Sequence, residues 1–257
     1  MIRITGFLLG ILLFINCRNV PDPIPTGLVT EKAMVVSARA EASKIGSDIL
    51  QKGGNAFDAM IATELALAVA YPYAGNIGGG GFMVFRKANG ETGGLDYREK
   101  APLAAHADMY LDSLGNVIPG KSTLGATAVG VPGTVAGVIA VHEKFGSLSL
   151  KEIMAPVIEL AKKGVVVTEN QAKRLENYRD IFMEVNSDTT FFATVYKTGD
   201  TIKYPALANT LQKISDKGKL QKNWPVLSRP KAVILLLKIL KNMKPNGDPQ
   251  LRSIIRT

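Results

Sequence analysis

Four consecutive glycines occur in the segment GNIGGGGFM, residues 75–83, between two apolar stretches of the chain. LALAVAYPYA precedes the segment, and VFRKANG follows it. Glycine loses more conformational entropy on folding than any other residue, so such a run indicates that the backbone must approach another group closely. That group could be a phosphate, a substrate or another part of the protein.

The residues before the glycine run predict a pair of helices. A helix is predicted within residues 38–54, closed by Gly53. Asn55 is placed to cap a second helix that runs to Pro72. This second segment is nearly all apolar, so the helix should be buried on most sides. Residues 35–37 are predicted to form a strand before the pair.

The residues after the glycine run predict a hairpin and further helices. FMVFRK and TGGLDYRE have the composition of two short strands, and turn residues 88–91 join them. Further helices are predicted to end near Phe145, to cover residues 149–164 after a cap at Ser147 or Ser149, and to cover residues 170–178. This order is typical of a sheet covered by helices, in an α/β or α+β class.

The charge of the chain is distributed unevenly. The 257 residues are 46% hydrophobic and carry a net charge of +9, which allows one large globular domain or two small ones. Residues 1–212 contain 20 basic and 20 acidic side chains, whereas residues 213–257 contain 11 basic and 2 acidic ones. The sequence therefore predicts a neutral body with a basic tail, and it does not favour a nucleic-acid-binding protein.

The N-terminal sequence MIRITGFLLGILLFINC has the layout of a secretory signal peptide. Arg3 precedes an apolar run that is too short to span a bilayer well, and Cys17 follows that run. The pattern resembles a bacterial lipoprotein signal in which Cys17 carries the lipid; simple export and an uncleaved anchor are the alternatives. We expect an exported protein, either periplasmic or membrane-anchored. Because Cys17 is the single cysteine, an intrachain disulfide is excluded.

The segment GNVIPGKS, residues 115–122, matches the spelling of a phosphate-binding loop. In such a loop Lys121 would reach a terminal phosphate and Ser122 would hold a magnesium ion. The flanking sequences ADMYLDSL and TLGATAVGVPG do not predict the buried strand and the helix that this loop requires. We interpret the segment as a surface turn.

The two histidines, His106 and His142, are far from each other in the sequence and from the cysteine. Metal binding would need more ligands, so we interpret both as surface or structural residues and assign no metal site. A Ser-His-Asp hydrolase is also not supported, because the spelling G-x-S-x-G does not occur.

Arg98 lies in the segment LDYREKAP, at the end of a predicted strand. At that position a guanidinium can point into a cleft and bind a carboxylate through two parallel hydrogen bonds, which a lysine cannot form. The alternative is a surface ion pair with Asp96 or Glu99.

Long motifs follow one another from about Ala33 to about Lys219: EASKIGSDILQKGGNAFDAMIATELALAVAYPYAGNIGGGGFMVFRK, LDYREKAP, AVGVPGTVAGVIAVHEKFG and APVIELAKKG. In this order they resemble the N-terminal part of the large subunit of γ-glutamyltransferase, also called γ-glutamyltranspeptidase or glutathione hydrolase. These motifs are long and uncommon, so the resemblance is strong.

The resemblance implies an α+β fold, namely the large-subunit portion of the αββα sandwich of an N-terminal-nucleophile hydrolase. It also implies that the glycine run packs a strand and a helix at close range near the substrate cleft and binds no phosphate. Arg98 would bind the α-carboxylate of the γ-glutamyl group of glutathione or another γ-glutamyl compound. In the family, a Thr freed by self-cleavage at the start of the small subunit forms a γ-glutamyl ester and passes the acyl group to water or an amino acid. No metal or organic cofactor is implied.

No segment of the chain resembles the Thr-led self-cleavage segment, so no catalytic residue is assigned. The pair Thr189-Thr190 lies in the large-subunit region and is interpreted as an ordinary segment. We therefore expect a truncated family member without its small subunit. With unpaired sheet edges and an uncovered apolar face it should be poorly soluble, and by itself it should not turn over a γ-glutamyl anilide.

The likeness to the family ends near Leu220, close to the point where the basic excess begins. We interpret the divergent tail as out-of-frame sequence; the alternative is a basic helix over KAVILLLKILKNM that lies on an anionic membrane surface. Two other functions stay open, a non-catalytic membrane-tethered protein that binds γ-glutamyl compounds through Arg98 and a P-loop nucleotide binder. The expected divisions are a lipoprotein-type signal peptide (1–17), a Pro-rich tether (18–28), the γ-glutamyltransferase large-subunit region (29–219) and the basic tail (220–257).

Overall fold

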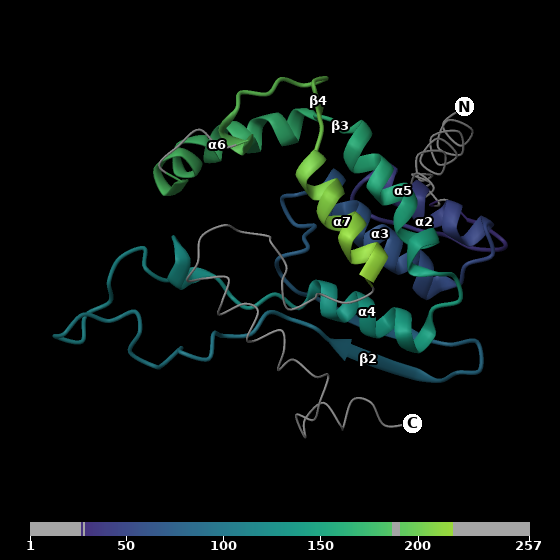
Figure 1. Cartoon of the computed structure of the whole chain (residues 1–257), viewed down its shortest axis with the longest axis horizontal. Helices are drawn as coiled ribbons and strands as arrows, with labels where there is room; N and C mark the ends of the chain where they lie inside the picture. Colours follow the sequence, from purple (N-terminus) through teal and green to yellow (C-terminus); the bar gives the residue numbers. More distant parts are fainter. Residues whose placement is uncertain (1–26, 28, 187–190, 218–257) are drawn as a thin grey trace, which may run out of the picture. The chain divides into compact units, whose positions relative to one another are not determined.

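The computed structural model describes residues 27, 29–186 and 191–217 (Figure 1). The chain divides into two compact units, Met1–Met34 and Val35–Thr257. The described residues of the first unit form neither helix nor strand, and within them the Thr30 hydroxyl donates a hydrogen bond to the Ala33 carbonyl at 2.9 Å. The predicted signal peptide, most of the tether and the basic tail lie outside the described residues. All elements below belong to the second unit.

The predicted helix pair is confirmed as α2 (Ala40–Gln51) and α3 (Ala56–Ala70). Asn55 caps α3: its side chain accepts hydrogen bonds from the backbone of Phe57 and Asp58, while the Asp58 carboxylate accepts one from the Asn55 amide. This reciprocal capping box satisfies amides that would otherwise have no partner at the helix start. Local sequence therefore determines where α3 begins.

The other predicted helices are also present, as α4 (Thr134–Phe145), α5 (Leu150–Lys163) and α6 (Glu169–Asn186). Ser149, not Ser147, caps α5, because its hydroxyl accepts a hydrogen bond from the Glu152 amide. α6 extends to Asn186, beyond the predicted end at residue 178, and none of its residues is buried. Two 3₁₀ turns, η1 (Ala126–Ala128) and η2 (Phe191–Ala193), and the final helix α7 (Pro205–Lys217) complete the described helices.

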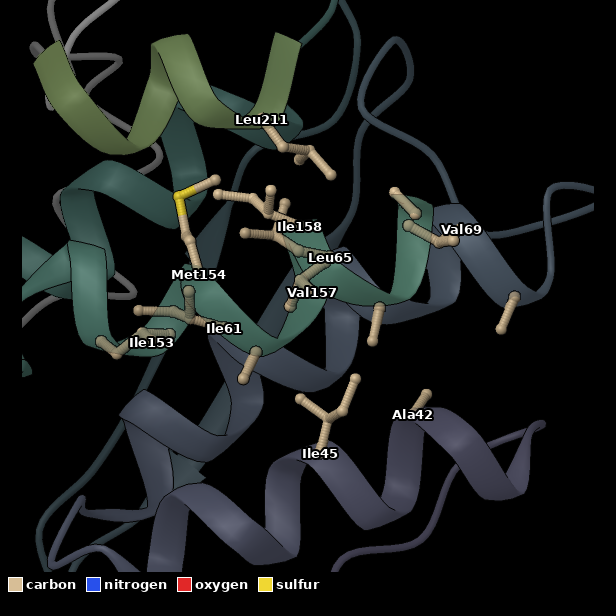
Figure 2. Close-up of a cluster of buried hydrophobic side chains, with 14 of the residues drawn as sticks. Ala42, Ile45, Ile61, Leu65, Val69, Ile153, Met154, Val157, Ile158 and Leu211 are labelled. Atoms are coloured by element: carbon tan, nitrogen blue, oxygen red, sulfur yellow. The ribbon is translucent and has the colours of Figure 1, made fainter. Parts of the chain in front are cut away.

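The core lies between helices, with α3 packed against α2, α4 and α5, and α5 packed against α7. Burying a Leu or Ile side chain fully stabilises the fold by about 1.5–3 kcal/mol. Figure 2 shows the cluster that joins four of these helices: Ile61, Leu65 and Val69 of α3, Ile153, Met154, Val157 and Ile158 of α5, Leu211 of α7, and Ala42 and Ile45 of α2.

The predicted hairpin is confirmed as β1 (Phe82–Arg86) and β2 (Thr92–Asp96), antiparallel, with Phe82 opposite Asp96. A second antiparallel pair joins β3 (Val165–Val166) to β4 (Thr201–Ile202). The fold is thus α+β, as predicted, but among the described residues the expected two-sheet sandwich is represented by these two short ladders. The strand predicted at residues 35–37 is wrong, because no other strand pairs with this segment and Val36 is exposed.

The Asp58 carboxylate is fully buried and joins the start of α3 to the loop between α4 and α5. It accepts hydrogen bonds from the amides of Ser147 and Leu148 and from the Ser147 hydroxyl, in addition to the Asn55 amide. The Asn55 side chain also donates to the Phe145 carbonyl at 2.7 Å. A buried carboxylate is tolerated only when hydrogen bonds replace its lost hydration, and here all of the donors except the Asn55 amide come from about 90 residues away in the chain.

The glycine run packs directly against backbone. A Cβ added at Gly80 would lie 2.5 Å from the amide nitrogen of Glu99 and 2.6 Å from the Cα of Arg98. The Gly79 carbonyl accepts hydrogen bonds from the amides of Gly133, at 2.7 Å, and Thr134, at 3.2 Å, where α4 begins. The group that Gly79 and Gly80 approach is therefore another part of the protein, and a side chain at Gly80 would separate these segments.

Among the helices of the described ranges, none combines the length and the hydrophobicity needed to span a bilayer.

We predict that Asp58→Asn lowers the free energy of unfolding by about 2 kcal/mol or more, because an amide group faces donors that the carboxylate now satisfies. Urea unfolding followed by circular dichroism measures the change. Asp48→Asn is the matched control, since the Asp48 carboxylate is 38% exposed and pairs with Lys44 on the surface of α2. The control should change stability by less than about 0.5 kcal/mol. Equal effects of the two substitutions would contradict the role given to Asp58.

We also predict different effects for two neighbouring glycines. Gly80→Ala should destabilise the protein by about 1–3 kcal/mol, because its methyl group would overlap backbone atoms that cannot move freely. A Cβ added at Gly78 meets nothing within 4 Å, so Gly78→Ala should be nearly neutral. Thermal melts of both variants test this difference, and a stable Gly80→Ala variant would contradict it.

Candidate functional site

Arg98 lies two residues after the end of β2, where the chain leaves the hairpin. Its backbone amide donates to the Asp96 carboxylate at 2.9 Å. Its side chain is 58% exposed, and one guanidinium nitrogen, Nη2, contacts the Glu99 carboxylate at 3.4 Å. The backbone at this residue is held, while more than half of the side chain is exposed, so the guanidinium can accept a carboxylate ligand.

Glu99 is the acid that a carboxylate ligand of Arg98 would have to displace. The pKa of Glu99 is lowered, first by a hydrogen bond from its own backbone amide and then by the Arg98 side chain. The Glu99 carboxylate is therefore ionised at neutral pH. The long contact between exposed groups stabilises little, so exchange of Glu99 for a ligand carboxylate has a low cost.

The Asn76 side chain links the glycine run to the start of α4. Its side-chain carbonyl Oδ1 accepts hydrogen bonds from the Gly79 amide at 2.8 Å and from the Thr134 hydroxyl at 2.6 Å. Thr134 is fully buried at the start of α4, whose Gly133 and Thr134 amides are already bonded to the Gly79 carbonyl. These two amides are therefore not available to a phosphate.

Tyr97, the residue before Arg98, is partly buried and is bonded to α3. Its hydroxyl donates to both carboxylate oxygens of Glu64, in the middle of α3, at 3.1 Å each. Burial raises the pKa of Glu64, and the hydrogen bond from Tyr97 opposes this shift in part. Burial, followed by the negative charge of Glu64, raises the pKa of Tyr97, so the phenol remains protonated and a donor.

The sequence interpretation missed the Glu64–Tyr97 pair. One signal was present: Glu64 is the one charged residue after the first turn of the otherwise apolar helix AFDAMIATELALAVA. A charge within an apolar helix indicates a specific partner elsewhere in the fold. The identity of that partner could not be inferred, because Tyr97 is 33 residues away in the sequence.

Lys121 and Ser122 do not belong to a phosphate-binding loop. Residues 115–122 form turns, with neither a strand immediately before them nor an α-helix immediately after them. The Lys121 amide donates to the Ile118 carbonyl, and the Lys121 carbonyl accepts from the Thr127 hydroxyl. The structure thus agrees with a turn and does not support the P-loop alternative.

The histidines have structural or surface positions. His142 in α4 is hydrogen-bonded through Nε2 to the Leu148 carbonyl at 2.9 Å, and His106 is exposed. Within the described ranges, no three His, Cys, Asp or Glu side chains are grouped as metal ligands. Cys17 and the Thr189-Thr190 pair lie outside the described residues.

Comparisons with known proteins agree on one family. A family model described as gamma-glutamyltranspeptidase matches residues 42–223. The glutathione hydrolase proenzyme of Pseudomonas sp. (strain A14) is 47% identical over 192 residues, which cover 73% of this chain and 33% of that protein. The corresponding protein of Escherichia coli (strain K12) is 41% identical over 192 residues, with the same coverage of 73% and 33%.

A solved structure shows the same relationship in three dimensions. The gamma-glutamyltranspeptidase of Helicobacter pylori superposes with a TM-score of 0.73 and 38% sequence identity, over 89% of this chain and 66% of that chain. The chain spans about a third of the length of the curated relatives that it matches. The matched residues include the glycine run, Tyr97 and Arg98. The chain belongs to the gamma-glutamyltranspeptidase family.

Proposed function

We propose that this chain recognises the γ-glutamyl group of glutathione or a related compound, and that Arg98 binds its α-carboxylate. The exposed guanidinium of Arg98 on a fixed backbone is the observation that carries this proposal. A planar fork can form two parallel charge-assisted hydrogen bonds with a carboxylate, which gives both affinity and orientation. The curated relatives are glutathione hydrolase proenzymes, which supports the choice of substrate class.

The proposed reaction is transfer of the γ-glutamyl group to water or an amino acid. The nucleophile is a Thr at the start of a small subunit, a partner that the resemblance implies. Its hydroxyl attacks the γ-carbonyl, the amide C–N bond breaks and the amine leaves with a proton. Water or an amino acid then attacks the γ-glutamyl ester, takes the acyl group and frees the Thr hydroxyl. In this scheme Arg98 contributes by holding the α-carboxylate, so that the γ-carbonyl is presented to the nucleophile in one orientation.

The proposed location follows from the N-terminal sequence alone. Residues 1–17 direct export, and Cys17 carries a lipid that anchors the chain to a membrane in the periplasm. The short apolar run between Arg3 and Cys17 supports this proposal.

We predict that Arg98→Ala weakens glutathione binding by about tenfold or more, since it removes a charge-assisted pair of hydrogen bonds. Arg98→Lys should also weaken binding, because an ammonium cannot form the two parallel bonds. Isothermal titration calorimetry with the full chain measures both effects. Arg86→Ala is the matched control, since Arg86 is an exposed arginine of β1. Unchanged affinity in Arg98→Ala would contradict the proposed function.

We predict that the chain expressed in a bacterial host incorporates radiolabelled palmitate, and that Cys17→Ser abolishes the label. Attachment of the lipid requires the sulfur atom that serine lacks. Asn16→Gly keeps Cys17 and places a small residue before it, so this control should retain the label. Membrane fractionation of the three proteins provides an independent measurement. A labelled Cys17→Ser protein, or an unlabelled wild type, would contradict lipidation at Cys17.

A further inference from the structure

Glu64 is a carboxylate with an unusual position. It lies in α3, where its sequence neighbours Thr63 and Leu65 are buried and the helix packs against α2, α4 and α5. Placing a charge in such surroundings destabilises the fold unless a hydrogen-bond donor compensates for the lost water. The Tyr97 hydroxyl is that donor, with both carboxylate oxygens at 3.1 Å.

The Tyr97 ring has little freedom to move away from Glu64. A Cβ added at Gly137, in α4, would lie 2.3 Å from the Cγ atom of the ring, and one added at Gly81 would lie 2.9 Å from Cε2. The ring therefore packs against two glycines, and any side chain at either position would overlap it. The Tyr97 amide also donates to the Gly81 carbonyl at 2.9 Å, which fixes the backbone at the same point.

Arg98 follows directly and has weak side-chain support of its own. Its guanidinium makes the 3.4 Å contact with Glu99 and is otherwise turned to solvent, with 58% of the side chain exposed. The place from which it reaches a ligand thus depends on the backbone of residues 97–99. That backbone in turn packs against Gly80, with no space for a side chain between them.

We propose that Glu64 and Tyr97 are positioning residues for Arg98: the Glu64 carboxylate holds the Tyr97 hydroxyl, and the held tyrosine sets where the Arg98 guanidinium meets a ligand carboxylate. This inference rests on the proposed function for its consequence in binding. The coupling itself, from the α3 carboxylate to the Arg98 backbone, depends only on the contacts described above and can be measured without a ligand.

The ionisation state of Glu64 should control the strength of this coupling. A carboxylate accepts the phenolic hydrogen bond on either oxygen, whereas a protonated carboxyl group accepts it less well. Because burial raises the pKa of Glu64, the coupling weakens as the pH falls through a value above that of an exposed glutamate. Tyr97 faces Glu64 and keeps its proton throughout this range, while Glu99, which faces Arg98, titrates at lower pH.

Amide NMR of the full chain labelled with ¹⁵N-glycine and ¹⁵N-arginine tests this directly. The Arg98 amide is assigned by its absence in Arg98→Lys, and the Gly81 amide by its absence in Gly81→Ser. In the wild type, both amides should shift with a midpoint above that of an exposed glutamate. In Glu64→Gln and in Tyr97→Phe that step should be lost. Tyr110→Phe is the control, since the Tyr110 hydroxyl bonds to the Thr127 carbonyl and its loss should leave the step unchanged.

Glutathione affinity is the second measurement. At neutral pH, Tyr97→Phe should weaken binding by about tenfold, because it removes the hydrogen bond. Glu64→Gln should weaken binding less, because the amide carbonyl still accepts a neutral hydrogen bond from the Tyr97 hydroxyl, and the double variant should be no weaker than Tyr97→Phe alone. The absence of the amide step in the wild type, or its survival in Tyr97→Phe, would overturn the inference whatever the ligand result. If the wild type shows the step but binds no glutathione, the proposed function fails while the coupling stands.

Discussion

Direct packing of the glycine run on other backbone segments is the constraint on which the rest of the structure depends. Gly80 lies against the backbone of Arg98 and Glu99, and the Gly79 carbonyl bonds to the first amides of α4. The end of the hairpin and the start of α4 are therefore both joined to the glycine run through backbone atoms, and the Gly80 contact leaves no room for a Cβ. The exposed guanidinium of Arg98 lies at the edge of this rigid contact.

Buried polar groups connect parts of the fold that are distant in the sequence. Asp58 ties the start of α3 to the loop before α5, and Thr134 bonds to Asn76 across 58 residues. Each of these groups has its hydrogen bonds satisfied, so it specifies one arrangement of the helices without the cost of an unpaired group.

Two glutamates show how strongly the surroundings determine the pKa of a carboxyl group: burial raises the pKa of Glu64, whereas hydrogen bonds lower the pKa of the exposed Glu99.

Much of the described fold could be predicted from sequence, and the errors have physical causes. The capped helices and the hairpin were correct because their signals are local: Asn55 and Asp58 meet within one helical turn, and turn residues 88–91 join adjacent strands. The prediction of a strand at residues 35–37 was wrong, because a strand needs a partner strand and composition does not reveal whether one is present. Arg98 was proposed as a binding residue from its place after a strand and from the resemblance, while Glu64 was overlooked because its partner is remote in the chain.

The sequence by itself determined where the capped helices α3 and α5 begin, which faces are apolar and which family the chain resembles. These properties follow from hydrogen bonds and hydrophobic periodicity within a few residues of one another. Only the tertiary structure decided that Gly80 packs against the backbone of Arg98 and Glu99, and which partly buried acid holds the tyrosine beside Arg98. Such contacts join segments tens of residues apart, and they exist only after the helices have packed around a common core and brought those segments together.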